Sequence, residues 1–336
     1  MLKVTRFGVS RLTISLCLAS LLASGAQAQI WPTSVIGVPE GEIEVLHVKG
    51  NVYMLAGSAG NIAVQVGPSG VLMVDTGSAA LADKVLAAVE TITSEPIRYI
   101  VNTSYPEDYT GGNGTISAAG RLATPFRGSG SSSVQGQFGG DRSSVISYYT
   151  VFHQMAAPSD EALVREENSW PDNTFSTPLK RLYFNDEPVM MMHQPSTTDG
   201  NTIVLFRKSD VIAAGAALNL ETYPVIDIEA GGSIQAVVVA LNRVIDMAVP
   251  SERSEGGTLV IPGRGRISDF AEVAQQRDMI SIIRDRVQSM INEGMSLADV
   301  LEARPTEGYD VRYGSDSGPW TTDMFVEAAY LSLVGQ

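Results

Sequence analysis

Short apolar runs separated by turn residues fill the chain from residue 42 to residue 74, and this spacing constrains the fold more than any other feature. Four runs follow one another, at residues 42–48, 52–56, 61–66 and 71–74. Turn residues, most of them Gly, Pro, Ser or Asn, fill the intervals at 49–51, 57–60 and 67–70. Runs of this length with such breaks are typical of strands joined by tight turns. The pattern predicts an antiparallel meander.

A helix and a buried strand follow the meander, and the same order returns later in the chain. Apolar residues at helical spacing predict a helix over 79–93, and 97–101 is predicted to form a strand. Further strands are predicted at 182–192, 202–206, 210–214 and 258–261. Helices are predicted at 159–165, 233–247, 270–293, 297–302 and 323–333. Two sheet-and-helix units bury their sheets against each other, so the sequence predicts an α/β fold, a four-layer αββα sandwich.

Two stretches are predicted to lack regular structure. Residues 110–147 are rich in Gly and Ser, with Gly128 to Ser133 at the centre, which favours a flexible loop or an irregular insertion. Residues 171–178 begin and end with Pro and are predicted to form a loop.

The first 28 residues have the features of a secretory signal peptide. Three basic residues precede an apolar run at 12–22, and Ala26-Gln27-Ala28 provides a small-residue cleavage site. The apolar run is too short to remain as a membrane-spanning helix. We therefore expect a periplasmic or secreted protein without a stable membrane anchor after cleavage. Residues 29–41 would form a lead-in segment, and 42–336 a single domain with a C-terminal helical extension.

Charge and cysteine content exclude several classes of site. The chain has 37 acidic and 23 basic residues, which gives a formal charge of −14. Cleavage of the signal peptide would remove three basic residues and leave a mature chain of 308 residues with a formal charge of −17. Binding of nucleic acid needs clustered Lys and Arg, so we expect no nucleic-acid partner. The one cysteine, Cys17, lies in the signal segment. The mature chain would therefore hold neither a disulfide nor a thiolate site.

Several short motifs lie at the ends of the predicted strands in a distinctive order. The first is Asp75-Thr76-Gly77, and the longest runs from Asn102 through Ser104, Pro106 and Asp108-Tyr109 to Gly111-Gly112-Asn113. Three more follow, Thr197-Thr198-Asp199-Gly200-Asn201, Ala214-Gly215-Ala216 and Pro262-Gly263-Arg264-Gly265. In these motifs, and over nearly the whole mature chain, the sequence resembles the metallo-β-lactamase superfamily. The resemblance implies the metallo-β-lactamase fold and, in the family, a zinc-dependent hydrolytic site.

The family's metal-ligand positions carry other residues in this chain. The resemblance places the first metal site at positions 104, 106 and 197, and the second at 108, 109 and 264, with 216 bridging. These positions hold Ser104, Pro106, Thr197, Asp108, Tyr109, Arg264 and Ala216. Catalytic zinc needs about three imidazole, thiolate or carboxylate ligands. Only Asp108 qualifies, so we expect no metal cofactor.

Arg264 would bring a permanent positive charge to the position of the second metal. The Asp108 carboxylate needs a counter-charge if it is buried. The sequence therefore predicts an Asp108–Arg264 ion pair. The surviving residues Asp75, Gly111–Asn113 and Asp199-Gly200 are predicted to be turn residues that keep the fold.

Two routes would preserve hydrolysis of β-lactam, ester or thioester bonds. One is a displaced metal site made of His193, Asp108 and Asp199. The other is a hydroxyl nucleophile near the site, from Ser104, Tyr109, Ser196 or Thr197, with His193 as its base. The sequence has no Gly-x-Ser-x-Gly elbow to support the second route.

The interpretation we favour is an exported pseudoenzyme that binds a ligand without catalysis. Hydroxyl groups and one cation suit a small anionic or carboxylate-bearing ligand. The predicted binding residues are Ser104, Tyr105, Asp108, Tyr109, Thr197, Asp199 and Arg264. A structural subunit of a secreted complex, with a protein partner, is the third interpretation.

Overall fold

The strands of the chain form two sheets, a larger sheet A and a smaller sheet B. The structure is a computed structural model that describes residues 38–39, 41–121, 142–158, 165–253 and 256–334. Sheet A contains β1 (Glu44–Lys49), β2 (Val52–Ser58), β3 (Gly60–Gly67), β4 (Gly70–Val74), β5 (Ile97–Asn102), β6 (Ser144–Tyr148) and β7 (Asn173–Phe175) in sequence order. Strands β1 to β4 are antiparallel neighbours, which confirms the predicted meander, and β4 to β7 are parallel.

Sheet B has five strands in the order β12-β11-β10-β9-β8. Its members are β8 (Leu179–Phe184), β9 (Glu187–His193), β10 (Thr202–Phe206), β11 (Val211–Asn219) and β12 (Leu259–Arg264). The pairs from β8 to β11 are antiparallel, whereas β11 and β12 are parallel because α5 crosses between them.

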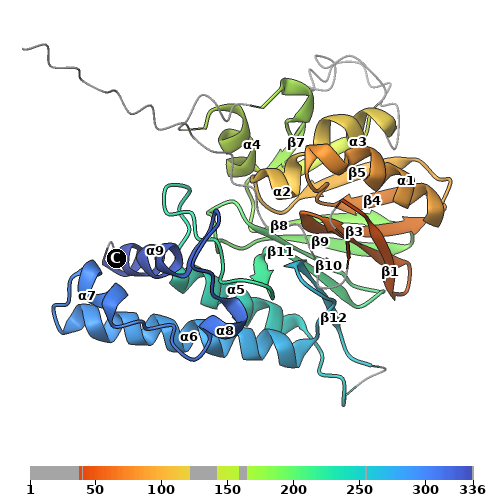
Figure 1. Cartoon of the computed structure of the whole chain (residues 1–336). Coiled ribbons are helices and arrows are strands. Elements are labelled where there is room, and N and C mark those ends of the chain that lie inside the picture. The colour runs from red at the N-terminus through yellow and green to blue at the C-terminus, as the bar shows by residue number, and fades with distance from the viewer. Residues whose placement is uncertain (1–37, 40, 122–141, 159–164, 254–255, 335–336) are drawn as a thin grey trace, which may run out of the picture.

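Helices cover the outer face of each sheet (Figure 1). Before sheet B the chain forms η1 (Ala79–Leu81), α1 (Ala82–Ile92), α2 (Glu107–Thr110), α3 (Asn113–Ala119), α4 (Tyr149–Ala156) and η4 (Glu167–Ser169). After β11 it forms α5 (Ile234–Met247), α6 (Phe270–Asn292), α7 (Leu297–Glu302), α8 (Asp310–Tyr313) and α9 (Thr322–Val334). Side chains of Ser233, Asp269 and Ser296 accept backbone N–H groups at the starts of α5, α6 and α7, which fixes where these helices begin.

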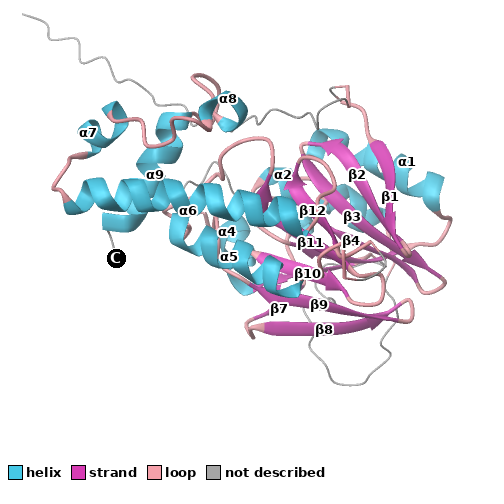
Figure 2. Cartoon of the chain, turned by 90° about the horizontal axis from the view of Figure 1, so that it is seen from below, coloured by secondary structure: helices cyan, strands magenta, loops and turns pink. Residues whose placement is uncertain are grey.

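Three apolar clusters fill the spaces between the layers. One lies between the sheets and joins side chains such as Leu72 of β4 and Phe206 of β10. A second joins sheet A to α1 and α3, and a third joins sheet B to α5, α6 and α9. The layers therefore run helix, sheet, sheet, helix, and the predicted four-layer αββα sandwich is confirmed. Figure 2 shows α7 near the end of α6 that lies away from the sheets, with α9 packed across α6 and α8 farther along it toward the sheets.

The sequence misplaced structure in both stretches that were predicted to be irregular. Within 110–147, residues 113–119 form α3 and residues 144–148 form β6. Within 171–178, residues 173–175 form β7 at the edge of sheet A. These segments contain few apolar residues, so their regular structure depends on pairing and packing with neighbours rather than on a periodic pattern.

The strand predicted at 182–192 is also wrong, because it is two strands. Asn185 and Asp186 have φ angles of 51° and 58°, which turn the chain back between β8 and β9. Two left-handed residues between paired strands are the signature of a tight hairpin, and Asn and Asp tolerate this conformation.

Some sequence predictions lie outside the described residues. They are the signal peptide at 1–28, most of the lead-in at 29–41, and nearly all of the helix at 159–165. None of the helices in the described part of the chain is both long and apolar enough to span a membrane.

Candidate functional site

The predicted motifs meet at one end of the two sheets. Asp75 follows β4, Thr103 follows β5, and Gly215 lies in β11 against Thr103. A Cβ atom at Gly215 would lie 2.1 Å from the Thr103 hydroxyl oxygen, and the φ angle of Gly215 is 51°, so this contact requires glycine. The Asn61 amide joins the last motif to sheet A by donating to the carbonyl oxygens of Pro262 and Gly265 at 3.0 and 2.7 Å.

Asp108 and Arg264 form the predicted ion pair. Arg264 Nη2 donates to Asp108 Oδ2, and the two side chains are 5% and 11% exposed respectively. Burial raises the pKa of Asp108, and the charge of Arg264 opposes this rise. Asp108 lies in the short helix α2, whereas Arg264 ends β12, so the pair ties the two sheets together at this end of the molecule.

Tyr109 and Glu221 lie beside the ion pair. A Cβ at Gly263 would lie 2.9 Å from the hydroxyl oxygen of Tyr109, and burial raises the pKa of Tyr109, so its hydroxyl keeps its proton at neutral pH. Glu221 follows β11, and its Oε1 atom is buried without a hydrogen-bond partner. Burial raises the pKa of Glu221 as well, and Arg264 opposes that shift. Sequence reasoning missed Glu221 because it belongs to none of the motifs.

Two of the predicted hydroxyl groups have different surroundings. Ser104 is fully buried, and its Oγ atom has no hydrogen-bond partner among the residues that the structure describes. Thr197 donates to Asn201 Oδ1 at 3.2 Å, and the same oxygen accepts the Thr198 N–H at 2.7 Å. The hydroxyl of Thr197 is thus part of the turn between β9 and β10, as predicted for the Asp199-Gly200 segment. The hydroxyl of Ser104 takes part in no such contact within the described residues.

Tyr105 forms its hydrogen bond with Asp227 and not with the ion pair. Its hydroxyl donates to Asp227 Oδ2, and Asp227 Oδ1 accepts the Ala230 N–H at 2.9 Å. Arg165 Nη2 lies 3.4 Å from the carbonyl oxygen of Tyr105. Asp227 and Arg165 were not predicted from the sequence, since both lie in irregular segments between the motifs.

His193 and Asp199 contact each other through the backbone rather than through a shared metal position. The ring of His193 stacks on Tyr148 at 3.5 Å between centroids, and its Nε2 lies 2.7 Å from the carbonyl oxygen of Asp199. Asp199 Oδ1 is buried without a partner. Across the described segments, no three His, Cys, Asp or Glu side chains are placed to hold a metal ion, so the structure does not assemble His193, Asp108 and Asp199 into the displaced site.

Asp75 is the most deeply buried carboxyl group of the site. It is 1% exposed, with a φ angle of 66°. Its Oδ1 accepts the Thr103 N–H at 2.7 Å and its Oδ2 accepts the Thr103 hydroxyl at 2.6 Å. These bonds hold the ends of β4 and β5 together, which fits the structural role predicted for Asp75. Burial outweighs them and raises the pKa of Asp75 to about 8.

The sequence matches no protein-family model and no curated protein. Among solved structures, the stereoselective inverting sec-alkylsulfatase Pisa1 from Pseudomonas sp. aligns over 87% of this chain and 50% of its own, with a TM-score of 0.62 and 14% identity. A metallo-β-lactamase from Pontibacter korlensis aligns over 71% of this chain and 99% of its own, with a TM-score of 0.51 and 15% identity. The DIM-1 metallo-β-lactamase aligns over 71% and 97%, with a TM-score of 0.51 and 17% identity.

This chain has the metallo-β-lactamase fold. It spans about half the length of the alkylsulfatase structure. The resemblance seen in the sequence motifs and the likeness seen in the layered structure therefore agree.

The residues at the ligand positions of this metallo-β-lactamase fold do not suit zinc. Pro106 and Ala216 carry no side-chain donor atom, and the hydroxyls of Ser104 and Thr197 are poor zinc ligands. Asp108 is the one strong ligand, and its Oδ2 already accepts from Arg264. A zinc ion beside this guanidinium would also meet a like charge in a buried place.

Asp75 gives the fold a measurable pH dependence. An unfolded Asp ionises near pH 3.8, whereas folded Asp75 keeps its proton up to about pH 8. The folded state therefore binds more protons within this window, and its free energy of unfolding should fall as pH rises from about 4 to 8, then level off. The Asp75→Asn variant has no carboxyl group to titrate at this position, so we expect a shallower fall. Urea unfolding of both proteins at several pH values measures the difference, and equal slopes would contradict the prediction.

Proposed function

We propose that this chain is an exported, non-catalytic binding protein built on the metallo-β-lactamase fold. The observation that carries the proposal is the buried Asp108–Arg264 ion pair. It replaces, with a neutral pair of side chains, the positive charge that a metal ion would supply at the same strand ends. Without that Lewis acid, the site lacks the group that polarises a carbonyl or activates a water in metal-dependent hydrolases.

Two unpartnered polar atoms on the motif segments and beside Arg264 support a binding role. Within the described residues, Ser104 Oγ and Glu221 Oε1 are both buried without hydrogen-bond partners, and Glu221 interacts with the charge of Arg264. Buried polar groups in folded proteins are nearly always satisfied by protein, water or ligand. A bound molecule with matching donors and acceptors would satisfy both atoms.

The cations near the site determine whether it can bind an anionic ligand. The predicted anionic ligand needs an available cation, and Arg264 is committed to Asp108. Arg165 is the other guanidinium near the site, and the carboxylates of Glu107 and Asp108 already act on it. An anionic ligand would thus have to share Arg264 or Arg165 with these carboxylates, which makes a carboxylate or phosphate screen informative.

The hydrolase alternative would need a base for its nucleophile. Among the predicted nucleophiles, Ser104 has a buried hydroxyl without a partner in the described residues, but His193 uses Nε2 on the backbone of Asp199 and stacks on Tyr148. An activated serine requires a base within hydrogen-bond reach. Hydrolysis of a β-lactam, an ester or a thioester stays the second hypothesis, and the sulfate ester chemistry named for the alkylsulfatase neighbour adds one more bond to assay.

The test is metal analysis and turnover on one sample of mature protein. The protein is isolated from the periplasmic fraction without chelator. Its measured mass is compared with the mass calculated for a chain that begins at Gln29. The metal content is then measured before and after dialysis against zinc. We expect less than about a tenth of a metal ion per chain. We also expect no hydrolysis of nitrocefin, a thioester or a secondary alkyl sulfate, with thermal shifts from a carboxylate and phosphate library reporting binding.

The outcomes separate the hypotheses. One or two bound metal ions per chain with turnover would overturn the proposal in favour of a rebuilt metal site. Turnover without metal would favour the hydroxyl nucleophile, and Ser104→Ala would then abolish it. A precursor mass that includes residues 1–28 would contradict export by signal cleavage.

A further inference from the structure

The turn between β9 and β10 carries a carboxylate that the turn itself does not use. The Asp199 N–H donates to the carbonyl oxygen of Ala230 at 2.8 Å. The Asn201 side chain accepts the Thr198 N–H at 2.7 Å. The Asp199 carboxylate takes no part, because its Oδ1 is buried without a hydrogen-bond partner and no ion pair of the described residues includes it. A ligand that supplies donors and a positive charge would stabilise this group.

Two hydroxyl groups beside the turn are also without partners in the described part of the chain. Thr202 begins β10 and is 1% exposed, and its Oγ1 forms no hydrogen bond there. Thr150 Oγ1, in the first turn of α4, is likewise buried without a partner. A Cβ atom at Gly200 would lie 2.7 Å from Thr150 Oγ1, so α4 begins directly against the turn. Both hydroxyls therefore flank the segment that holds Asp199.

Strand alternation shows which way the Thr202 side chain points. Val204 and Phe206 of β10 belong to the apolar cluster between the sheets, whereas Ile203 belongs to the cluster on the outer face of sheet B. Because side chains alternate along a strand, Thr202 faces the same side as Val204, toward sheet A. Thr202 pairs with His193 of β9, which places these two side chains next to each other on that face.

Two stacked rings lie beside these polar atoms. The rings of His193 and Tyr148 are 3.5 Å apart between centroids, with 6° between their planes. Tyr148 ends β6 of sheet A and packs against the cluster between the sheets. Burial raises the pKa of Tyr148, and the charge of Asp199 adds to the rise, so the carboxylate lies close to this phenol. One carboxylate, two hydroxyls and an aromatic stack thus meet between the ends of the two sheets.

A protonated primary amine matches this set of groups. Its ammonium group has one positive charge and three N–H donors, which suit one carboxylate and two hydroxyl oxygens. Aromatic rings also attract ammonium ions. A neutral ligand would leave the Asp199 carboxylate without a counter-charge. A divalent metal ion is not favoured, since within the described ranges no three acidic or His side chains gather to hold one.

We propose that the candidate site binds its ligand through a primary ammonium group held at Asp199, between Thr150 and Thr202. The Thr202 N–H donates to the carbonyl oxygen of Thr103 at 2.9 Å, so this position adjoins Ser104 of the candidate site. The inference rests on the proposed binding function and names a chemical group that the ligand carries. The arginines considered above for an anionic group are separate residues, so a zwitterion would use both sets.

Saturation-transfer NMR of the full mature chain with n-butylamine at low ionic strength tests the proposal. For so small a ligand we expect a dissociation constant of about 1–10 mM. Asp199→Asn should lower the affinity about tenfold, and Thr202→Val, which removes one hydroxyl, about threefold. The matched control is Asp278→Asn, which removes the same charge from an exposed position of α6 and should change the affinity less than about twofold. Thermal melting of each variant establishes that the fold is retained.

Other compounds identify the group that is bound. Tetramethylammonium has the charge without N–H donors, butanol has a donor without the charge, and K⁺ is a bare cation. We expect each to displace butylamine at least about tenfold less effectively than unlabelled butylamine does. Equal displacement by any of them would overturn the proposal in favour of that chemistry. Absence of butylamine binding at about 50 mM would also overturn it, and buried water would then satisfy these atoms.

The results are separable from those for the proposed function. If carboxylates or phosphates bind but butylamine does not, the amine inference alone fails. If the protein hydrolyses a substrate while its butylamine binding still depends on Asp199, the non-catalytic assignment alone fails.

Discussion

Replacing Arg264 with alanine is expected to lower the free energy of unfolding by about 3–5 kcal/mol near neutral pH. The substitution leaves the Asp108 carboxylate buried, with a side chain 11% exposed, and without the guanidinium that it contacts. The loss comes from the uncompensated charge rather than from lost attraction alone. Urea unfolding of the wild type and the variant measures the difference.

The pH dependence of this loss identifies its cause. Burial already raises the pKa of Asp108, and Arg264 is the main group that opposes the rise. In Arg264→Ala the folded chain should therefore take up a proton at Asp108 more readily than the wild type. The destabilisation should be largest at high pH and shrink as pH falls through the raised pKa, since a neutral carboxyl tolerates burial.

Two further variants serve as controls for the ion pair. Arg266 lies two residues along the chain and pairs with Glu272, but its side chain is 67% exposed, so Arg266→Ala should cost less than about 1 kcal/mol. Combining Asp108→Leu with Arg264→Leu removes both charges and should recover much of the stability lost in Arg264→Ala. If Arg264→Ala were no more harmful than Arg266→Ala, the pair would not be an important stabilising contact.

The Asp108–Arg264 contact is the part of the candidate site that the sequence predicted correctly. The two positions are 156 residues apart, and only the motif order of the family placed them at one location. Burial and charge then predicted their pairing. The hydrogen bond of Tyr105 to Asp227 and the charge interaction of Arg264 with Glu221 were not predictable in this way, because Asp227 and Glu221 lie in loops whose path depends on packing rather than on a motif.

The secondary structure was likewise predicted where the sequence pattern is strong and missed where order depends on neighbouring elements. Strongly periodic segments such as α5 and α6, and the short strands of the meander, were predicted almost to their ends. Segments α3, β6 and β7 were missed because their sequences are polar and short, and neighbouring strands or helices supply their order. Asn185 and Asp186 are turn-forming residues in the sequence, but the apolar residues on both sides led to the prediction of one continuous strand.

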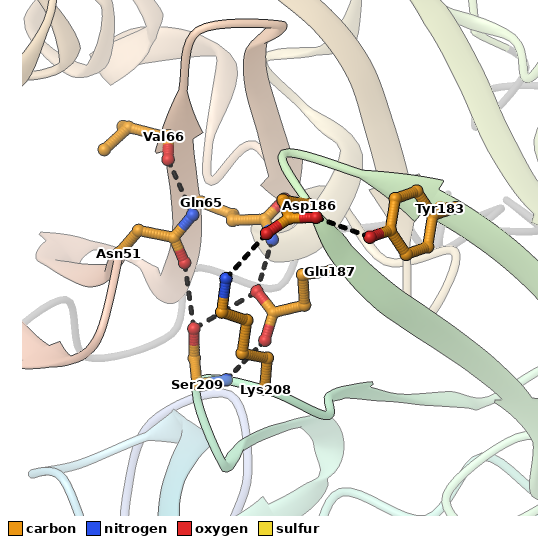
Figure 3. A network of polar contacts seen from close by, with 8 residues as sticks. All are labelled: Asn51, Gln65, Val66, Tyr183, Asp186, Glu187, Lys208 and Ser209. Carbon is orange, nitrogen blue, oxygen red and sulfur yellow. Dashed lines mark hydrogen bonds and ion pairs between the residues drawn. The ribbon is translucent and has the colours of Figure 1, made fainter.

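A buried polar network at the ends of strands from both sheets provides the second large prediction (Figure 3). Glu187 is 1% exposed and begins β9 of sheet B. Its Oε2 accepts from Gln65 Nε2 of β3 in sheet A at 2.6 Å and from Ser209 Oγ at 3.1 Å, and its Oε1 accepts the Ser209 N–H. Ser209 in turn donates to Asn51 Oδ1 at 2.8 Å. One carboxylate thus accepts two buried N–H donors, from the Gln65 amide of β3 and the Ser209 backbone in the turn between β10 and β11, and it shares the Ser209 hydroxyl with Asn51.

Glu187→Ala is expected to lower the free energy of unfolding by about 3 kcal/mol, because it leaves the Gln65 amide and the Ser209 N–H buried without an acceptor. Glu187→Gln should cost less. In the wild type, Gln65 Oε1 has no partner in the described residues, and it can accept from the new amide after rotation of the Gln65 side chain.

Asp186→Asn is the matched control. Asp186 pairs with Lys208 in solvent, with 79% of the Asp186 side chain exposed, so we expect little change in the free energy of unfolding. Urea unfolding ranks the three variants. If Glu187→Gln were as damaging as Glu187→Ala, the negative charge itself, and not the number of hydrogen-bond partners, would hold the two sheets together at these strand ends.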